Sequence, residues 1–493
     1  MDSFKETLAR AITLQEAGKA EEALPLYQTL LRQHGNMGDL HYLVGLAYQD
    51  LKQWQAAYDA LRQAVALDAE RVDFQMAIGL TFQELEQPEQ AKQAYSRAIG
   101  LNPDDFHAYY RLGDSHIDLG QPDQAISAFT RAIKLKPDFH EAWINLGLCL
   151  KAIGQMEAAL KTFRAAIQLA PEDPKAKVDY AMTLLATGDF ENGWKHYTER
   201  FKFKHVFNDM KRIPANIPAW GGCDLTDQVL LVLCEQGYGD NLQFARYLPQ
   251  LKQLGVKKLI VESKNRLINL FRYNELADEY CNVLDVQKVQ ADYYVPLLEL
   301  PRLLGTRVET IPTDLPTFKV SPEFLQHLAP HTQHGLFKVG LIWTGKPLHA
   351  RDPARRRSCP FELLAPLAKV QGATFYSLQT GLLDEEVPTH LDAETPLIDL
   401  SKILGHFHET AAAMQQMDLI ISIDTASAHL AGGLNCPTWL LTPYSADWRW
   451  GLQGPSTPWY PQMRLFRQPT PGAWQPVIEQ VATALEETIQ EGR

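Results

Sequence analysis

The sequence predicts an all-helical repeat array followed by an α/β region that contains two parallel sheets. Three observations support this fold class. Small residues recur every 34 positions through the first two hundred residues. A proline-containing stretch follows at residues 212 to 220, and after it short apolar runs alternate with helical patterns. A chain of 493 residues is too long for one compact core, so several domains are expected.

The amino-acid composition argues against several classes of function. The net charge of −12 argues against broad binding to nucleic acid or anionic membranes, which requires an excess of Lys and Arg. No apolar run approaches the roughly 18 residues of a spanning helix, and the N-terminus lacks the apolar core of a secretion signal. We therefore expect a cytoplasmic protein. The six cysteines are scattered without a C-x-x-C pair, which favours reduced thiols over disulfides or a zinc site.

Four series of residues, each repeating every 34 positions, define the repeat array. Small residues form two of them: Ala23, Ala57, Ala91, Ala125 and Ala159 in one, and Gly45, Gly79, Gly113 and Gly147 in the other. Four places after each alanine stands a large apolar residue: Tyr27, Leu61, Tyr95, Phe129 and Phe163. Prolines 103, 137 and 171 close their units.

This pattern resembles the tetratricopeptide repeat, a helix–turn–helix unit with small residues where its two helices cross. Such units cannot bury their apolar faces alone, so about six of them, in residues 1–206, should stack into a solenoid. The resemblance implies a groove that docks a protein or peptide. A spacer and an arm for self-association through the repeats remain alternatives.

After a connector at residues 207–220, two series of strand-like runs predict two Rossmann-like halves, 221–330 and 331–493, facing a cleft. The first series is VLLVLC, KKLIVES and ADYYVPL; the second is KVGLIWTG, ATFYSLQTG, DLIISID and PTWLLTP. A terminal helix is expected from about residue 476 to residue 490.

The loop after the first of these strands raises a question about one carboxylate. Gly237 and Gly239 form a turn before a helix, and Asp240 stands at the joint. Ligands bind at such strand ends in α/β sheets, but an aspartate there also serves as an ordinary helix cap. A dinucleotide fingerprint is disfavoured because its third glycine would fall on Leu242.

Three loops of the second half should open toward one edge of its sheet. In DTASAH, Asp424 closes a strand, and Thr425 begins a helix whose N-terminus is suited to bind a phosphate group. The alternative is an ordinary capped helix in which His429 is a buried core residue. The second loop carries Arg351, Arg355, Arg356 and Arg357, whose guanidinium groups are suited to pair with a diphosphate. The alternative is that these arginines form a solvated surface. The third loop, YSLQTG, carries Gln379.

Residues from about 229 to 470 resemble bacterial heptosyltransferase-like glycosyltransferases of the GT-B fold, in a branch fused to tetratricopeptide repeats. The matching elements are GYGDNLQFARYLP, GLIWTGKPLH with RRRSCP, SLQTG, DLIISIDTASAHLAG and PYSADWRW. The layout is also similar to that of protein O-GlcNAc transferases, although no close match to their catalytic motifs is present.

The resemblance implies a role for each matching residue. Asp240 would be the general base on the acceptor hydroxyl. The residues that would hold the nucleotide sugar are Gly239, Thr344, Gly345, Arg357, Gln379, Asp424, Thr425, Ala426 and His429. Heptosyltransferases usually have an acid where Gln379 stands, which leaves the base and ribose contacts open. Asp447, Trp448 and Arg449 would either wall the cleft or serve packing.

The implied function is inverting transfer of a sugar from a nucleotide-diphosphate sugar to a hydroxyl, without a metal or another cofactor. A protein acceptor docked on the repeats is preferred. Two alternatives remain open: a transferase acting on a lipid-linked or polysaccharide acceptor, and a non-catalytic repeat scaffold with a degenerate transferase region.

Overall fold

The computed structural model describes residues 2–492 except 205, 207–209, 334–336, 346–356 and 383–386. The chain divides into two compact units, Met1–Asp173 and Pro174–Arg493. In the described part, no helix is long and apolar enough to cross a membrane. All six cysteines are free thiols, as the sequence predicts.

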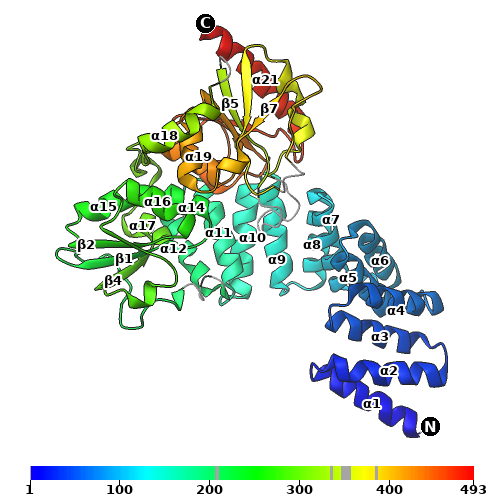
Figure 1. Ribbon diagram of the computed structural model, residues 1–493. Helices are drawn as coiled ribbons and strands as arrows, with labels where there is room; N and C mark the ends of the chain where they lie inside the picture. Colours follow the sequence, from blue (N-terminus) through cyan, green and yellow to red (C-terminus); the bar gives the residue numbers. More distant parts are fainter. Residues whose placement is uncertain are drawn as a thin grey trace. The chain divides into compact units, whose positions relative to one another are not determined.

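The first unit consists of consecutive helices that pack in antiparallel pairs, coloured blue to cyan in Figure 1. Each pair is one repeat, and the helices are α1 (Asp2–Glu16), α2 (Ala20–His34), α3 (Gly38–Asp50), α4 (Trp54–Leu67), α5 (Val72–Glu84), α6 (Pro88–Leu101), α7 (Phe106–Asp118), α8 (Pro122–Leu135), α9 (His140–Ala152) and α10 (Met156–Leu169). The first unit is therefore built of helical hairpins, as the sequence predicts.

The glycine series lies where the two helices of a repeat cross. A Cβ atom on Gly79 would stand 2.6 Å from the Tyr95 ring, and one on Gly113 would stand 2.6 Å from the Phe129 ring. Carbon atoms do not approach so closely, so each aromatic ring fills the space that the missing side chain leaves. The alanines of the other series are fully buried. These contacts explain why the four series share one period.

The second unit begins with one more helical hairpin, α11 (Pro174–Ala186) and α12 (Phe190–Tyr197), followed by the short helix η1 (Thr198–Lys202). This hairpin is part of the core of the α/β region. The Trp194 ring lies 5.3 Å from that of Trp448, and the Phe190 ring lies 6.1 Å from that of Trp459. The sixth repeat that the sequence predicts is thus built into the second unit.

The first sheet is fully parallel and has the strand order β3-β2-β1-β4. Its strands are β1 (Val229–Leu233), β2 (Lys258–Glu262), β3 (Glu279–Cys281) and β4 (Tyr293–Pro296). Helices α14 (Tyr238–Phe244), α15 (Leu248–Gln253), α16 (Asn265–Tyr273) and α17 (Leu300–Leu303) accompany it. Buried aliphatic residues fill β1 and β2 on both faces, as crossover helices require.

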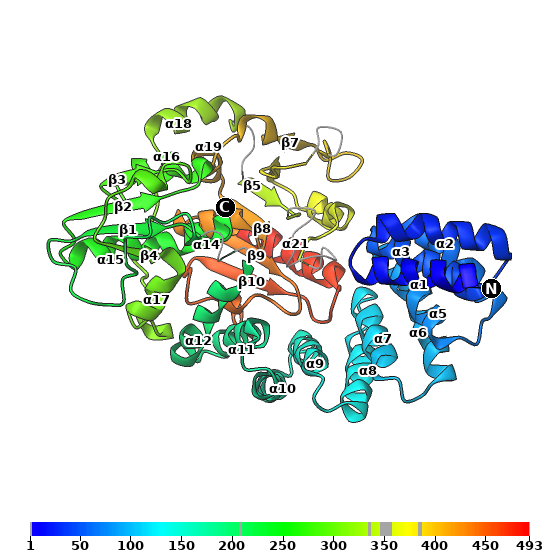
Figure 2. The same ribbon diagram turned by 90° about the horizontal axis from the view of Figure 1, so that it is seen from below.

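The second sheet is also parallel, with the order β10-β9-β8-β5-β6-β7, and α21 runs beside it in Figure 2. The strands are β5 (Phe337–Ile342), β6 (Ala373–Ser377), β7 (Leu397–Asp399), β8 (Leu419–Ile423), β9 (Thr438–Thr442) and β10 (Met463–Arg467). The helices are α18 (Pro322–Leu328), α19 (Phe407–Met414), α20 (Ala426–Gly433) and α21 (Trp474–Glu491).

Numbered by their order within this sheet, the strands run 3-2-1-4-5-6, which is the doubly wound order of Rossmann folds. The N-terminal helical solenoid and the parallel α/β region of the predicted fold class are both present. All seven predicted strands are present too. The structure adds β3, β7 and β10, each at an edge of its sheet.

Candidate functional site

The predicted site residues follow strands at the reversal points of the two sheets. In the first sheet the order reverses between β1 and β4, and the loop to Asp240 leaves the carboxyl end of β1. In the second sheet it reverses between β5 and β8, where Thr344 and Asp424 follow the strands. Ligands of doubly wound sheets bind at such reversal points, because the helices on either side diverge there.

Asp240 has two structural partners. One carboxylate oxygen accepts a hydrogen bond from the Gly237 backbone N–H at 3.0 Å, which caps α14. The other pairs at 2.5 Å with Nη2 of Arg449, which is 209 positions away. The predicted cap is therefore present, and an ion pair with the second half accompanies it.

Arg449 belongs to the segment DWRW, which follows β9, and its side chain is only 5% exposed. Its Nη1 pairs with Asp447 at 2.8 Å, and its Nε donates to the side-chain oxygen of Gln243. Two carboxylates thus balance a buried guanidinium, and burial without such partners would be strongly unfavourable. Arg449 joins the two halves rather than facing solvent.

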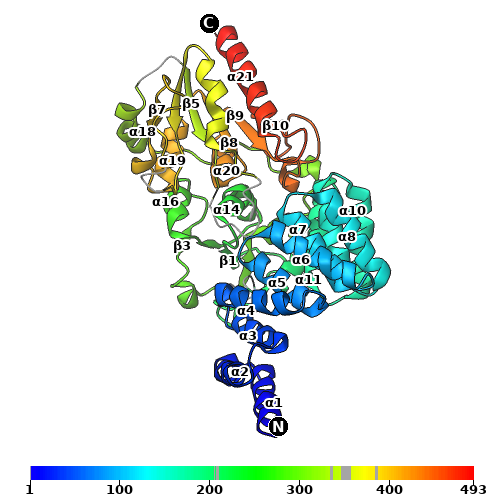
Figure 3. The same ribbon diagram turned by 90° about the vertical axis from the view of Figure 1, so that its right-hand side faces the viewer.

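Helix α14 packs directly on α20, as Figure 3 shows. A Cβ atom on Gly239 would stand 2.8 Å from the His429 ring and 3.4 Å from the Ala426 Cα atom. Only glycine permits this approach of the two helices. The structure therefore packs Gly239 directly against the first turn of α20, at a place where the sequence analysis expects the two halves to face a cleft.

His429 is buried and fully packed. Its Nδ1 lies 2.9 Å from the Tyr460 hydroxyl, and its ring stacks on Trp450 with centroids 5.1 Å apart. Burial, reinforced by the Arg449 charge, lowers its pKa to about 3, so the ring is neutral at physiological pH. These contacts are those of the core histidine that the sequence analysis kept as an alternative, and they give His429 no charge with which to meet a phosphate.

The loop after β5 brings a cation to the same edge of the sheet. The Ser358 hydroxyl accepts from the Gly345 N–H at 3.1 Å, and the Thr344 hydroxyl lies 3.3 Å from the same oxygen. The Arg357 guanidinium lies against Gly345, within 3.5 Å of the position that a Cβ atom would take. The predicted residues Arg351, Arg355 and Arg356 lie outside the described residues.

Gln379 has a clear structural role. Its side-chain oxygen accepts from the N–H groups of Trp343 and Thr344, at 3.2 and 3.0 Å, and its nitrogen donates to the Thr380 carbonyl. The side chain is almost fully buried. Gln379 therefore holds the end of β5 in place, and its amide already has protein partners.

Asp424 is partly exposed at the end of β8. Burial, followed by the negative charge of Asp447, raises its pKa to about 6, while the cation of Arg357 opposes this. The next residue, Thr425, precedes the first turn of α20 but makes no side-chain capping bond. Its buried hydroxyl has no hydrogen-bond partner among the described residues. The N-terminus of α20 is thus not capped by its own threonine, while Ala426 provides its first backbone N–H.

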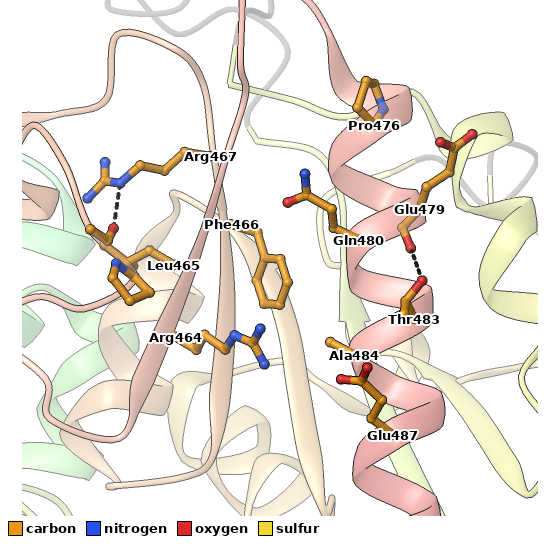
Figure 4. A pocket seen from close by; sticks show the side chains of 12 residues that line it. Arg464, Leu465, Phe466, Arg467, Pro476, Glu479, Gln480, Thr483, Ala484 and Glu487 are labelled. Atoms are coloured by element: carbon orange, nitrogen blue, oxygen red, sulfur yellow. Dashed lines mark hydrogen bonds between the residues drawn. The ribbon is translucent and has the colours of Figure 1, made fainter.

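Two surface hollows lie away from these residues. One, of about 760 Å³, lies between β10 and α21, where Arg464 and Glu487 face each other across it (Figure 4). The other, of about 520 Å³, borders β2 and β3. Within the described ranges, no group of three His, Cys, Asp or Glu residues is placed to hold a metal ion.

A second buried charge network escaped the sequence analysis. Arg200 of η1 pairs with Glu235 at 2.6 Å and with Glu299 at 2.8 Å, and all three side chains are buried. Glu235 directly precedes the loop to Asp240, so the helical hairpin holds this loop. No motif marks Arg200, and a basic residue in "YTERF" is expected to be exposed.

Comparisons with known proteins agree with the repeat assignment. The sequence profile described as "Tetratricopeptide repeat" matches residues 8–71, 76–117 and 110–174. The N-terminal region therefore contains tetratricopeptide repeats. Among solved structures, MamA is 26% identical with a TM-score of 0.32, covering 33% of this chain and 95% of MamA. YrrB, described as "a TPR protein with an unusual peptide-binding site", is 26% identical with a TM-score of 0.32, covering 34% of this chain and 88% of YrrB.

A longer relative is Protein FlbA of Caulobacter vibrioides, which is 29% identical over 316 residues. The similarity covers 59% of this chain and 52% of FlbA, so the chain matches about half the length of that relative. Because 59% of the chain exceeds the 173 residues of the first unit, the similarity also reaches the α/β unit.

Proposed function

We propose that the second unit is a glycosyltransferase of the GT-B type that moves a sugar from a nucleotide-diphosphate sugar to a hydroxyl. The observation that most strongly supports the proposal is that loops from the reversal points of the two parallel sheets meet. Gly239 packs against α20, and Asp240 forms an ion pair with Arg449. The sequence motifs described above occupy these loops. The GT-B fold and the activity are both part of the proposal.

The donor would bind at the carboxyl edge of the second sheet. Its diphosphate would lie at the N-terminus of α20, where backbone N–H groups and the helix dipole favour an anion. Arg357 adds a full positive charge beside Gly345. The partnerless hydroxyl of Thr425 supplies a further donor. These groups would bear the charge of the leaving nucleoside diphosphate without a metal.

The acceptor would approach Asp240. Asp240 takes the proton of the hydroxyl while the hydroxyl oxygen attacks the anomeric carbon; the bond from that carbon to the phosphate oxygen breaks, and the nucleoside diphosphate leaves with the electron pair. A carboxylate has about four lone-pair sites, so the bonds to Gly237 and Arg449 leave acceptor capacity. Arg449 would hold the base in a fixed orientation.

The decisive experiment has two steps. A thermal-shift screen with nucleotides and nucleotide sugars identifies the donor, since a ligand at 100 times its Kd stabilises by about 2.7 kcal/mol. Turnover with that donor is then measured for the wild type and for Asp240→Asn, where a loss of about 10²- to 10⁴-fold is expected. Retained turnover in Asp240→Asn would show that Asp240 only caps the helix.

A non-catalytic scaffold is the second candidate. The specific observation in its favour is that Asp240 and His429 both already have protein partners. A scaffold would bind no nucleotide sugar in the screen, whereas a transferase would bind one and hydrolyse or transfer it.

The repeats indicate a protein or peptide partner, and we propose that this partner is the acceptor. A docked chain is held near the second unit at high effective concentration. Labelled donor added to a cell lysate with the enzyme would place the label on protein. Label in lipid or polysaccharide would instead establish the alternative acceptor.

A further inference from the structure

Tyr460 stands just before β10, and its side chain is fully buried against helix α20. A Cβ atom on Gly432 of this helix would overlap the Tyr460 ring, so only glycine at this position admits the ring. The Tyr460 hydroxyl lies 2.9 Å from Nδ1 of His429, which is one helical turn before Gly432. The packing of α20 therefore brings this hydroxyl to the histidine.

The surroundings of the Tyr460 hydroxyl determine the direction of this hydrogen bond. Among the described residues, Nδ1 of His429 is the only acceptor that the hydroxyl meets. The nearby Arg246 guanidinium, 4.7 Å from the centre of the Tyr460 ring, has donors and no acceptor. If Nδ1 carried a proton, the buried hydroxyl could donate to no group, which is unfavourable. The hydroxyl therefore donates to Nδ1.

This direction decides which nitrogen of His429 carries the proton. Burial, reinforced by the Arg449 charge, lowers the pKa of His429 to about 3, so the ring holds a single proton at physiological pH. A neutral imidazole whose Nδ1 accepts a hydrogen bond carries its proton on Nε2. The stacked ring of Trp450 holds the plane of the imidazole. His429 is thus a neutral Nε2–H donor.

The Nε2–H group of His429 lies in the candidate site and has no acceptor in the described part of the chain, although the side chain is only 5% exposed. A Cβ atom on Gly239 would stand 3.5 Å from Nε2, and Asp240 is the next residue. A nearly buried donor without an acceptor is unfavourable and requires an explanation. A ligand atom that accepts from Nε2 would provide it.

We propose that Tyr460 is a positioning residue, which fixes the proton of His429 on Nε2 and so presents a neutral donor to an oxygen atom of the transferred sugar. This inference rests on the glycosyl transfer proposed above. Charged groups such as Arg357 suit the diphosphate, whereas an uncharged donor suits an uncharged hydroxyl or ring oxygen. The place of Nε2 beside Gly239, next to the proposed base, favours the reacting sugar over the nucleoside.

The first measurement requires no ligand. The full chain is prepared with isotope-labelled histidine, and the NMR signals of His429 are identified as those that His429→Gln lacks. We expect the nitrogen shifts of a neutral imidazole with its proton on Nε2, unchanged from pH 5 to pH 8. A His429 ring that carries its proton on Nδ1, or that titrates in this range, would overturn the proposal.

Tyr460→Phe removes only the hydroxyl oxygen and tests the role of Tyr460 directly. Because Nδ1 then has no donor, His429 should lose its single state and show the signals of both tautomers. Tyr247→Phe is the matched control, since Tyr247 is also fully buried in this unit but its ring stacks on that of Phe244. The control should keep the wild-type spectrum of His429. An unchanged spectrum in Tyr460→Phe would show that Tyr460 does not fix the proton.

Turnover with the nucleotide sugar found in the donor screen gives the functional result. Tyr460→Phe should lower kcat about 3- to 10-fold, as expected for one neutral hydrogen bond, and should change the donor KM by less than about twofold. Tyr247→Phe should keep the wild-type kcat. A fall in kcat of the same size in both variants would mean that loss of a buried hydroxyl, not the state of His429, lowers turnover.

The contact with the sugar is tested by adding ligands to the labelled wild type. The Nε2–H signal of His429 should move when the nucleotide sugar is added, and it should move much less with the nucleoside diphosphate alone. A shift that the nucleoside diphosphate reproduces in full would place the contact on a phosphate and refute the sugar contact.

The two proposals fail separately. If no nucleotide sugar binds, the transferase proposal fails, whereas the ligand-free spectra still decide whether Tyr460 fixes the proton of His429. If Asp240→Asn loses turnover while Tyr460→Phe keeps both the wild-type spectrum and the wild-type kcat, the transferase proposal stands and the role of Tyr460 is refuted.

Discussion

The two units differ in how far apart in the sequence their decisive contacts lie. In the repeat unit, Gly79 meets Tyr95 only 16 positions away, and the same contact recurs in three other hairpins, at Gly45, Gly113 and Gly147. In the α/β unit, Asp240 pairs with Arg449 across 209 positions, and Arg200 pairs with Glu299 across 99. A short-range contact leaves a periodic trace in the sequence, whereas a long-range contact leaves none.

The same difference determines how a substitution should act. A change at a repeat crossing disturbs one hairpin and its neighbours, because each repeat contacts only adjacent repeats. A change in the charge networks of the α/β unit disturbs several elements at once. The following substitutions test this contrast in order of expected effect.

The largest effect is expected from Arg200→Met. This change leaves the buried carboxylates of Glu235 and Glu299 without their common partner. Breaking a buried ion pair on one side costs about 3–5 kcal/mol. Hydrogen exchange followed by mass spectrometry should show lost protection in residues 229–300 and unchanged protection in residues 20–170.

Arg302→Gln is the matched control, because Arg302 also pairs with Glu299 but is 39% exposed. Its loss should cost less than about 1 kcal/mol. If Arg302→Gln were as damaging as Arg200→Met, burial would not be the reason for the effect.

The junction between the two sheets can be measured by a double-mutant cycle on Asp240→Asn and Arg449→Gln. The two side chains share an ion pair, so their effects on unfolding free energy should be non-additive by about 1–3 kcal/mol. The same cycle with exposed Glu486→Gln in place of Asp240→Asn should be additive. Additivity in both cycles would mean that the pair does not couple the two sheets.

A smaller, local effect is expected at the repeat crossings. Gly113→Ala places a methyl group 2.6 Å from the Phe129 ring and should destabilise the first unit by about 1–3 kcal/mol. Gly100→Ala adds the same methyl group where nothing lies within 4 Å and should stabilise by about 0.4–1 kcal/mol. Equal effects, measured by denaturant unfolding, would contradict the crossing explanation.

These contrasts also explain which features could be predicted from the sequence. The repeats, the inner strands and the edge strand β4 were predictable because burial gives them a period or a continuous apolar run. The edge strands β3, β7 and β10 were missed because they are short or partly exposed; in β10, for example, Arg464 is exposed between buried neighbours. At edges the apolar pattern is interrupted, so it resembles a loop.

The candidate site shows the same limit. Sequence motifs placed Arg357 and Thr425 on loops that follow β5 and β8, because parallel strands direct their carboxyl ends to one edge of the sheet, whereas Asp240 follows β1 of the other sheet. The motifs could not show that Arg449 is the partner of Asp240, or that His429 is neutral and packed. Those facts depend on side-chain burial, which arises only when distant segments meet.

The smallest expected effect is a pH dependence that arises at Asp424. Its folded pKa, raised to about 6 by burial and by Asp447, lies above the unfolded value of about 3.9, so the folded state binds more protons between these limits. The stabilising contribution of this proton is complete below about pH 4 and is lost as pH rises through 6. Asp424→Asn, which removes the charge, should therefore melt higher than the wild type at pH 8, and this difference in melting temperature should be clearly smaller at pH 5. His429 should not obscure this result, because its pKa of about 3 keeps it neutral over the whole range. A constant difference between the two proteins from pH 5 to 8 would show that the Asp424 carboxylate is already compensated by Arg357 and Arg449.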